Sequence, residues 1–408
     1  MPKKRKTPAR PSPVKRSKRS RRPRQIVLPP KKAAPQDYLP LPPPRIKQPL
    51  FSERRRLEAN FELALRAPKV SVVVVNYDGV DFLWNCLFAL KTQTYPPFEV
   101  ILVDNASSDA SVSFVQSNYP QVKVLECDEN FGYAMGANLG VKMAVGDLVA
   151  VLNNDAVVTP DWLLRMVKEF REGWPDLGAL AGMVKDKQVA EGTREKNSFV
   201  PNFLGNRVEG HFEDPAAVFY PEGCAFLYPR FLAADGPFDP DYFIYQEDFS
   251  FGWRMRLEGK AVARSRSAKV FHEEGGTMSR FHEWRSVYYK TRNRWLNLFV
   301  FYSAADLLKV LPWVLLEALW RLVRGLFTGF DLFAGTLVAV IWVVTHPRAI
   351  LRKRSEAQAR RKVGDGEVVR WLSGRVAPDG GLFSRPLNFI SLFYCAVVGL
   401  PVLESLQD

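Results

Sequence analysis

Two adjacent acidic residues could take part in proton transfer. Glu247 and Asp248 follow an apolar and aromatic run, 241–245 (DYFIY), so they are expected to open onto a partly dry pocket. Neighbouring carboxylates repel one another, and the one farther from a bound cation should have a raised pKa, which suits a general base acting on a hydroxyl group. The alternative is that both acids merely start a helix, where its dipole favours negative charge.

A third acid and a histidine could hold a cation. Asp155 follows Asn153 and Asn154 at the end of an apolar run, and a carboxylate in such a polar loop suits Mg²⁺ or Mn²⁺. His272 closes the apolar run AKVFH, and a lone histidine at such a position is usually structural. The alternatives are a capping Asn-Asn-Asp turn before a helix near Pro160, and a purely structural histidine.

Glycine-rich nucleotide motifs do not follow the first apolar run. That run ends in Asn76 and Tyr77, and neither GxGxxG nor GxxxxGK[ST] occurs there, which disfavours an oxidoreductase or a P-loop ATPase. Gly132, Gly136 and Gly140 instead recur every four residues, which places them on one helix face, where close packing is the simplest interpretation.

The elements that must position these residues form an α/β pattern. Short apolar runs predict buried parallel strands near 70–76, 99–103, 122–126 and 147–152. Helices are expected between them, near 80–92, 110–118, 133–145 and 160–171. This alternation predicts right-handed crossovers and a doubly wound sheet that binds ligands at the carboxyl ends of its strands.

Segments in a fixed order carry a family resemblance over about residues 69–300. They read VVVVNYDG, LVDNASSD, NFGYAMGANLG, LNND, EGCAFLYPR, FDPDYFIYQEDFSFGWR, VFH and YYKTRNR. Together they resemble glycosyltransferase family 2, enzymes of the GT-A fold that use nucleotide-sugar donors, and in particular rhamnosyltransferase-like enzymes of the bacterial cell envelope. The resemblance implies a GT-A domain over 68–300, with donor binding in 68–185 and acceptor binding and the base in 186–300.

The resemblance assigns roles to the two adjacent acids, Asp155 and His272. It implies that Asp248 is the catalytic base and that Glu247 contacts the acceptor or orients its neighbour. Asp155 corresponds to the last acid of the family's metal-binding DxD motif, although the preceding residues here are asparagines, which removes one negative charge. His272 falls where the family places a second contact to the metal or the diphosphate.

Donor-binding roles follow from the same resemblance. Asp104 is expected to accept the imide proton of uracil or thymine, with Asn76 and Tyr77 lining the same pocket. Asn154 is expected to lie beside the donor as well.

Three further residues are expected near the ribose and the diphosphate. Asn130 and Gly132 are placed there by the resemblance, with simple turn formation as the alternative. Arg292 could reach the diphosphate, although an arginine on an amphipathic helix is more often solvated.

The implied reaction is an inverting, metal-dependent transfer of a sugar. The donor would be dTDP-rhamnose or a UDP-hexose, and the acceptor a hydroxyl of a lipid-linked or polymeric cell-envelope saccharide. The asparagine-rich LNND loop keeps open a non-catalytic relative that only binds nucleotide sugar or saccharide. A nucleic-acid-binding protein acting through its basic N-terminal tail is the other alternative.

The N-terminal tail accounts for most of the basic charge. Residues 1–25 contain twelve Lys or Arg and no acid, and removing them from the net charge of +14 leaves +2. We expect a disordered basic and Pro-rich tail over 1–50, with anionic lipid as its favoured partner and nucleic acid as a less favoured one. No apolar core follows the basic start, so a secretory signal peptide is not expected, and four scattered cysteines fit a reduced, cytoplasmic setting.

The region 301–408 is expected to be helical and associated with a membrane. The run 325–344 holds one charged residue, Asp331, and has the length of a bilayer span. Seven basic residues follow within 348–362, and a crossing would place them on the side opposite the cytoplasmic nucleotide sugar. We therefore predict a peripheral or monotopic attachment to the cytoplasmic face, with a membrane hairpin as the alternative and a second apolar stretch at 387–403.

Overall fold

The computed structural model describes most of the chain beyond residue 67. The described residues are 68–96, 98–186, 199–221, 223–272, 283–378, 381 and 383–406, and they belong to the unit Pro44–Asp408. The predicted disordered tail, 1–50, lies outside these residues, as does the glycine-containing segment 273–276 that follows His272.

Four parallel strands form the first half of the sheet. Valine-rich and leucine-rich runs build them because such side chains fill both faces of a buried strand. In spatial order they are β3 (Lys123–Glu126), β2 (Phe98–Asp104), β1 (Val70–Asn76) and β4 (Leu148–Asn153). The connecting helices are α2 (Val80–Lys91), α3 (Ser111–Asn118) and α4 (Gly132–Met143), and α5 (Trp162–Gly173) follows β4. The sequence predicted each of these elements to within two residues at either end.

The second half of the sheet is mixed, which corrects the prediction of a doubly wound parallel sheet. Beyond β4 the strand order is β9 (Ala225–Pro229), β6 (Leu177–Asp186), β10 (Ala261–His272) and β5 (Ala156–Val158). β9 runs antiparallel to β4 and β6, and β5 runs antiparallel to β10. The described part of the chain between β6 and β9 contains the small hairpin β7 (Phe199–Pro201) and β8 (Arg207–Glu209) and no helix that would fix a parallel direction.

Helix α4 packs closely on the parallel strands through its glycines. A Cβ atom at Gly140 would lie 2.4 Å from the Val73 side chain on β1 and 2.9 Å from the Val103 side chain on β2. The interpretation of these glycines as a packing face is therefore confirmed.

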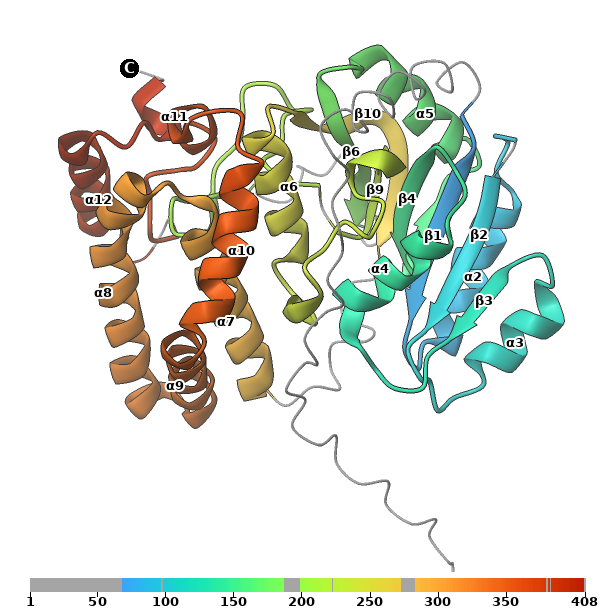
Figure 1. Cartoon of the computed structure of the whole chain (residues 1–408), viewed down its shortest axis with the longest axis horizontal. Helices are drawn as coiled ribbons and strands as arrows, with labels where there is room; N and C mark the ends of the chain where they lie inside the picture. The colour runs from blue at the N-terminus through green and yellow to red at the C-terminus, as the bar shows by residue number, and fades with distance from the viewer. Residues whose placement is uncertain are drawn as a thin grey trace, which may run out of the picture. The chain divides into compact units, whose positions relative to one another are not determined.

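The remaining helices gather beside the sheet. Short α6 (Glu247–Leu257) lies between the sheet and a helical group formed by the C-terminal part of the chain (Figure 1). That group contains α7 (Glu283–Phe301), α8 (Ala304–Thr328), α9 (Phe330–Thr345), α10 (Pro347–Ala359), α11 (Asp365–Val369) and α12 (Ser384–Val398). Short 3₁₀ turns complete the described chain at Arg230–Leu232, Pro240–Tyr242 and Leu403–Leu406. One apolar core runs from sheet residues such as Phe226 to Trp313 on α8 and Cys395 on α12.

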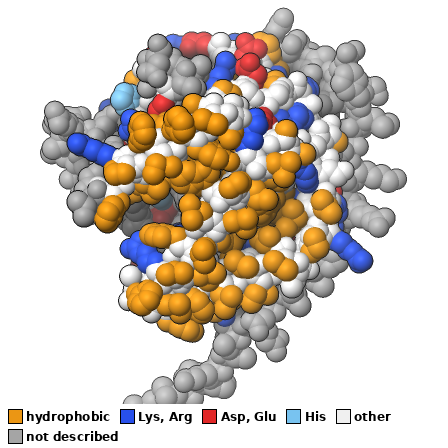
Figure 2. All heavy atoms as spheres, turned by 90° about the vertical axis from the view of Figure 1, so that its left-hand side faces the viewer, with side chains coloured by type: hydrophobic (Ala, Val, Ile, Leu, Met, Phe, Trp, Pro, Cys, Tyr) orange, Lys and Arg blue, Asp and Glu red, His pale blue; other side chains and the backbone are white. Residues whose placement is uncertain are grey.

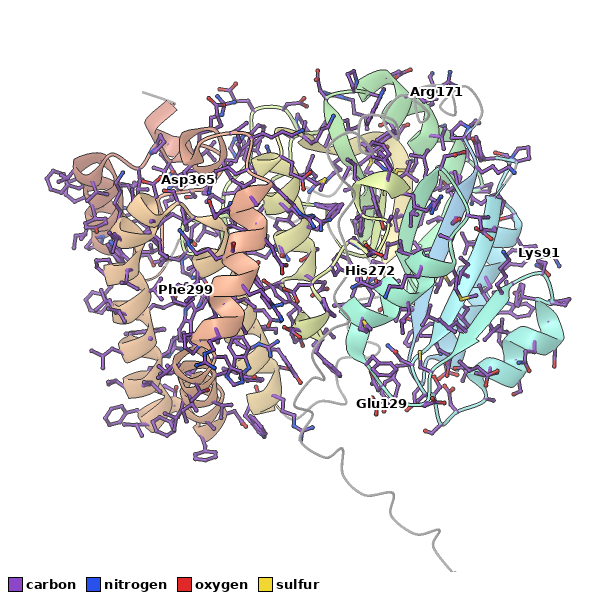
Figure 3. The ribbon with its side chains drawn as sticks, in the orientation of Figure 1. Lys91, Glu129, Arg171, His272, Phe299 and Asp365 are labelled. Carbon is purple, nitrogen blue, oxygen red and sulfur yellow. The ribbon has the colours of Figure 1, made fainter. Side chains whose placement is uncertain are left out.

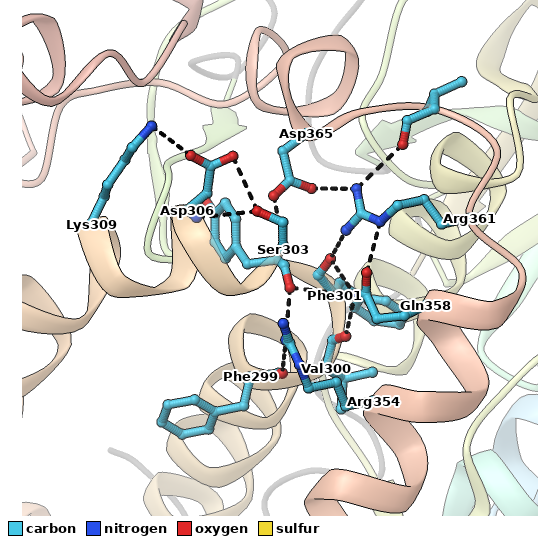
Figure 4. A network of polar contacts seen from close by, with 12 residues as sticks. Phe299, Val300, Phe301, Ser303, Asp306, Lys309, Arg354, Gln358, Arg361 and Asp365 are labelled. Atoms are coloured by element: carbon cyan, nitrogen blue, oxygen red, sulfur yellow. Dashed lines mark hydrogen bonds and ion pairs between the residues drawn. The ribbon is translucent and has the colours of Figure 1, made fainter.

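A polar clamp fixes the corner between α7 and α8 (Figure 4). Arg354 and Gln358 of α10 and the following Arg361 donate hydrogen bonds to the final carbonyl groups of α7. Asp365 accepts a hydrogen bond from the Ser303 backbone N–H at 2.6 Å and pairs with Arg361 at 2.5 Å. These contacts satisfy the free carbonyls at the end of α7 and set the direction in which α8 leaves.

The apolar run 325–344 is divided between two helices. Gly329, with φ of +156°, separates α8 from α9. Within the described part of the chain, no single helix combines the length and hydropathy that a bilayer crossing needs, whereas α9 and α10 pass that test only as a pair bent by 75°. The attachment to a membrane stays a prediction at this point.

Candidate functional site

Three predicted donor-binding residues form one buried network at the carboxyl ends of β1, β2 and β4. The Asn76 side-chain amide donates to Asp104 Oδ1 at 3.1 Å, and the Asn154 amide donates to Asn76 Oδ1 at 2.8 Å. All three side chains are buried. Parallel strands end at the same edge of a sheet, which explains why residues 28 and 78 positions apart in the chain meet here.

Asp104 also holds the loop that follows β2. Its Oδ1 accepts a hydrogen bond from the Ser107 hydroxyl at 2.6 Å, and its Oδ2 accepts one from the Ser107 backbone N–H at 2.9 Å. Asp78, which the sequence argument missed, accepts from the Ser108 backbone N–H at 2.6 Å and so joins this loop to the end of β1. Tyr77, which lies between Asn76 and Asp78 in the chain, is half-buried. The contacts of Asp104 and Tyr77 with a nucleotide base stay predictions.

The two predicted cation ligands lie next to each other. His272 Nε2 is 3.0 Å from Asp155 Oδ1, and the Asn153 side-chain amide is 3.5 Å from the same nitrogen. The antiparallel pairing of β5 with β10 sets Ala156 opposite His272, which brings the neighbouring Asp155 to the histidine. His272 lies at the end of β10, between the sheet and the C-terminal helices (Figure 3).

The donor set of this pair fits a hard divalent cation that is shared with a substrate. Among the described residues, no group of three or more His, Cys, Asp or Glu side chains is arranged to hold a metal ion. Mg²⁺ is commonly held by one or two carboxylates together with substrate phosphates and water, so a full protein cage is not required. Asp155 supplies one such carboxylate and His272 adds an imidazole nitrogen, and both side chains are partly buried.

The acid pair lies at the first turn of α6, and its two members differ in environment. Glu247 is buried, and its Oε2 has no hydrogen-bond partner among the described atoms. Burial, followed by the neighbouring Asp248 carboxylate, raises the pKa of Glu247 to about 8. Asp248 is half-buried, and its two oxygens accept hydrogen bonds from the backbone N–H groups of Gly223 at 3.2 Å and Phe249 at 2.7 Å.

This difference corrects the reasoning about the general base. The sequence argument placed the raised pKa on the base, and the structure raises the pKa of its neighbour Glu247. Below about pH 8 Glu247 is therefore mainly neutral. The negative charge of the pair then resides on Asp248, whose oxygens already face two N–H donors.

Residues at the start of β9 connect the acid pair to the cation pair. The Gly223 N–H binds Asp248, and the next residue, Cys224, accepts a hydrogen bond from the Asn153 backbone N–H at 2.9 Å. The Tyr133 hydroxyl donates to the Gly223 carbonyl at 2.8 Å. Burial raises the pKa of Tyr133 well above its usual value, and the charges of Glu247, Cys224, Asp248 and Asp155 raise it further, in that order. Asp155, Glu247 and Asp248 are therefore all near enough to act electrostatically on one tyrosine hydroxyl.

Asn130 and Gly132 form the turn into α4. Asn130 Oδ1 accepts a hydrogen bond from the Gly132 N–H at 2.9 Å, so the turn interpretation is confirmed. Gly132 has φ of +81°, and a Cβ atom there would lie 2.5 Å from the Phe243 carbonyl oxygen. Glycine is needed because the loop before α6 passes directly over the start of α4, and the expected contacts with ribose and diphosphate stay predictions.

The loop before α6 is conformationally strained and is held by helix α7. Phe243, Tyr245 and Gln246 all have positive φ, at 57°, 72° and 68°. The Asn293 side-chain amide lies within hydrogen-bond distance, 2.8–2.9 Å, of the carbonyl oxygens of residues 242, 244 and 245. Asn297, one turn later, donates to the Gln246 carbonyl at 3.3 Å. Such strain persists only where surrounding contacts enforce it, and here it aims the first turn of α6 at the site.

The sequence argument missed Asn293 and Tyr133, and its alternative of a solvated Arg292 is wrong. Arg292 is buried, which rules out the solvated alternative. Its guanidinium donates to the Asp241 carbonyl at 2.5 Å and lies 5.0 Å from the Trp342 ring centroid on α9. No described contact brings Arg292 to Asp155 or His272, so its role at a diphosphate stays a prediction. The sequence signal for Asn293 is its spacing of four from Asn297 on one helix face.

Residues 71–236 match the profile of one protein family, described as "Glycosyl transferase family 2". The O-antigen biosynthesis protein RfbC of Myxococcus xanthus is 28% identical over 229 residues, which cover 52% of this chain and 18% of that protein. The N-acetylglucosaminyl-diphospho-decaprenol L-rhamnosyltransferase of Mycobacterium tuberculosis is 27% identical over 239 residues, covering 51% of this chain and 77% of that enzyme.

Solved structures show weaker similarity. Residues 1–349 of Staphylococcus aureus TarS align with a TM-score of 0.47 and 18% identity, covering 72% of this chain and 87% of that one. The mannosyltransferase PcManGT of Pyrobaculum calidifontis, in complex with GDP-Man and Mn²⁺, aligns with a TM-score of 0.43 and 17% identity, covering 85% and 97%.

Replacing Asn293 should impair turnover more than donor binding. In Asn293→Ala, the carbonyls of the strained loop lose their shared donor, so the acid pair is no longer held in place. We expect kcat to fall by at least about tenfold with little change in the dissociation constant of the donor. Glu283→Ala, at an exposed position on the same helix, is the control. A kcat within error of the control would refute the positioning role.

Glu247→Gln should become stabilising as the pH rises. A carboxyl group whose pKa is higher in the folded than in the unfolded state contributes stability below the unfolded value of 4.5, and that contribution is lost as the pH rises toward 8. The glutamine variant does not lose stability in this way. Near pH 9 its free energy of unfolding should therefore exceed that of the wild type by at most on the order of 4 kcal/mol, with little difference near pH 5. Denaturant unfolding at both pH values measures the difference, and a difference independent of pH would contradict the assignment.

Proposed function

Residues 71–236 of this chain belong to glycosyltransferase family 2, and on that premise we propose an inverting, metal-dependent transfer of a sugar from a nucleotide-sugar donor to an acceptor hydroxyl. One observation carries the proposal. The loop residues Gly223 and Cys224 before β9 contact both parts of the proposed site: the Gly223 N–H binds Asp248, and the Cys224 carbonyl binds the backbone of Asn153, whose side chain lies beside the Asp155–His272 pair.

Asp248 acts as the general base. It accepts the proton of the acceptor hydroxyl while that oxygen bonds to the anomeric carbon and the bond from this carbon to the diphosphate oxygen breaks. Attack from the face opposite the diphosphate inverts the configuration. When Glu247 is neutral, the negative charge of the pair stays on Asp248. The neutral Glu247 carboxyl can also donate a hydrogen bond that orients Asp248 or the acceptor.

Asp155 and His272 would hold the cation. A bound Mg²⁺ or Mn²⁺ neutralises the charge that develops on the departing diphosphate. Asn153 and Asn154 place amides where the family carries an additional acid. The Asn154 amide instead fixes Asn76, so this loop contributes one carboxylate to the cation and uses its other polar side chain for support.

The nucleotide lies over the ends of β1 and β2 in this proposal. Asp104 and Tyr77 face the base, and Asn130 with Gly132 faces the ribose and diphosphate. A dTDP-rhamnose donor or a UDP-hexose is proposed, with a lipid-linked or cell-envelope saccharide as the acceptor. The sequence similarity to an N-acetylglucosaminyl-diphospho-decaprenol L-rhamnosyltransferase supports this choice among sugar donors.

Asp248→Asn should abolish transfer and leave donor binding nearly intact. The amide keeps the shape of the side chain but cannot accept the proton, so a loss of at least about a hundredfold in kcat is expected. Donor affinity is measured by calorimetry, and transfer by release of the nucleoside diphosphate with candidate acceptors. Asp235→Asn, at an exposed position, is the matched control. Equal transfer by the two variants would exclude Asp248 as the base.

Asp155→Ala should weaken binding of the cation. We expect the affinity for Mn²⁺ in the presence of UDP or dTDP, measured by calorimetry, to fall by at least about tenfold, since even ligand-supporting residues commonly contribute that much. Activity should be lost together with metal binding. Unchanged Mn²⁺ affinity in this variant would show that the cation is held elsewhere.

A further inference from the structure

The distribution of polar and apolar side chains on helix α8 is the reverse of that on a typical surface helix of a soluble protein. Two of its charged side chains turn inward: Glu317 forms two hydrogen bonds with Arg294 of α7, at 2.7 and 2.8 Å, and Arg321 donates to the Thr291 hydroxyl at 2.9 Å. Its outward side is apolar, with exposed side chains that recur every three or four residues, namely Leu315, Leu319, Trp320, Val323, Leu326 and Phe327. A helix that contacts water normally shows the opposite distribution.

Helix α12 repeats this inversion. Its buried side consists of Ser384, Asn388, Ser391 and Cys395. Asn388 binds the backbone of the preceding loop, accepting from the N–H groups of residues 376 and 377 at 2.9 Å each. Its exposed side consists of large apolar residues, namely Phe389, Ile390, Phe393 and Val397. In both helices, polar side chains thus make internal contacts and large apolar side chains point outward.

The most exposed aromatic side chains lie where α8 meets α9. Phe327 is 83% exposed and Phe330 is 76% exposed, on either side of the break at Gly329. We define the apolar face as the exposed apolar side chains of α8 and α12 named above, together with those of α9, namely Phe330, Leu337, Val338, Ile341 and Val344. Figure 2 shows hydrophobic side chains gathered across the side of the molecule that these helices form.

We propose that the apolar face inserts into the headgroup and acyl boundary of an anionic lipid bilayer. Inverted amphipathic helices rich in Leu, Phe and Trp bind in this way, and their affinity grows with the apolar area that leaves water. Monomeric soluble proteins rarely expose a contiguous apolar patch of this kind. The proposal rests on helix polarity and stands independently of the proposed reaction. If transfer also occurs, the acceptor is presented at the same lipid surface.

The charges around the apolar face favour anionic lipid over a protein partner. Within the described residues of α8, α9 and α12, the exposed charged side chains are basic, Arg324 and Arg385, whereas the acids are withdrawn from full exposure. Arg348 and Arg352 are exposed at the start of α10, which follows α9 directly. Basic residues near a membrane surface are attracted to anionic headgroups, each by about tenfold or less in affinity.

Co-sedimentation of the full chain with vesicles tests this proposal. Vesicles of phosphatidylcholine and phosphatidylglycerol are compared at low salt and at roughly 1 M salt, where a Debye length of about 3 Å screens the basic N-terminal tail. We expect the wild type to sediment in both conditions. Phe327→Glu combined with Phe330→Glu should reduce the bound fraction at high salt by about tenfold or more, because two exposed phenyl groups no longer leave water.

The control is Leu164→Glu, which adds a charge at an exposed leucine of α5 on the sheet side and should sediment like the wild type. Melting curves establish that each variant folds. Release of the wild type by high salt, or unchanged binding of the double variant, would overturn the proposal. So would a wild-type dimer in lipid-free solution that the double variant converts to monomer, since the face would then join two copies of this chain. Sedimentation requires no donor, so an inactive protein gives the same result.

Discussion

The contact between Asp155 and His272 depends on a reversal of strand direction. After β4 the chain turns at the Asn-Asn-Asp loop and continues as β5, which pairs antiparallel with β10 at the far edge of the sheet. This pairing brings together two residues that are 117 positions apart. The loop that provides Asp155 also provides Asn154, which supports Asn76 and through it Asp104. In the proposed reaction, the cation-binding and nucleotide-binding residues are therefore supported by one short loop.

The proposed site contains four carboxylates, Asp104, Asp155, Glu247 and Asp248, and their surroundings differ. Asp104 is stabilised by hydrogen bonds from Asn76 and Ser107. Burial keeps Glu247 mainly neutral near pH 7, which leaves the charge of its pair on Asp248. Asp155 pairs with His272. Hydrogen bonds, burial and a nearby histidine thus each act on a different one of these carboxylates.

Local pattern predicted the parallel half of the fold but not the mixed half. Strands such as Val70–Asn76 are apolar throughout and are recognisable without their partners, whereas the direction of β9 depends on a long loop that carries no periodic signal. The residue pattern offered Asp155 and His272 as separate candidates, and only the family resemblance joined them. Asn293 and Tyr133 were not predicted because they donate hydrogen bonds to backbone carbonyls. The pattern of side chains in a sequence carries no information about such contacts. The run 325–344 was read as one segment because hydropathy does not register the turn at Gly329.

Diffraction from crystals grown with Mn²⁺ and a nucleoside diphosphate tests the central claim most directly, because the anomalous signal locates the ion. We predict a peak at about 2.0–2.3 Å from both an Asp155 carboxylate oxygen and His272 Nε2, with diphosphate oxygens completing the coordination. An ion bound to the diphosphate but contacting neither of these side chains would contradict the account.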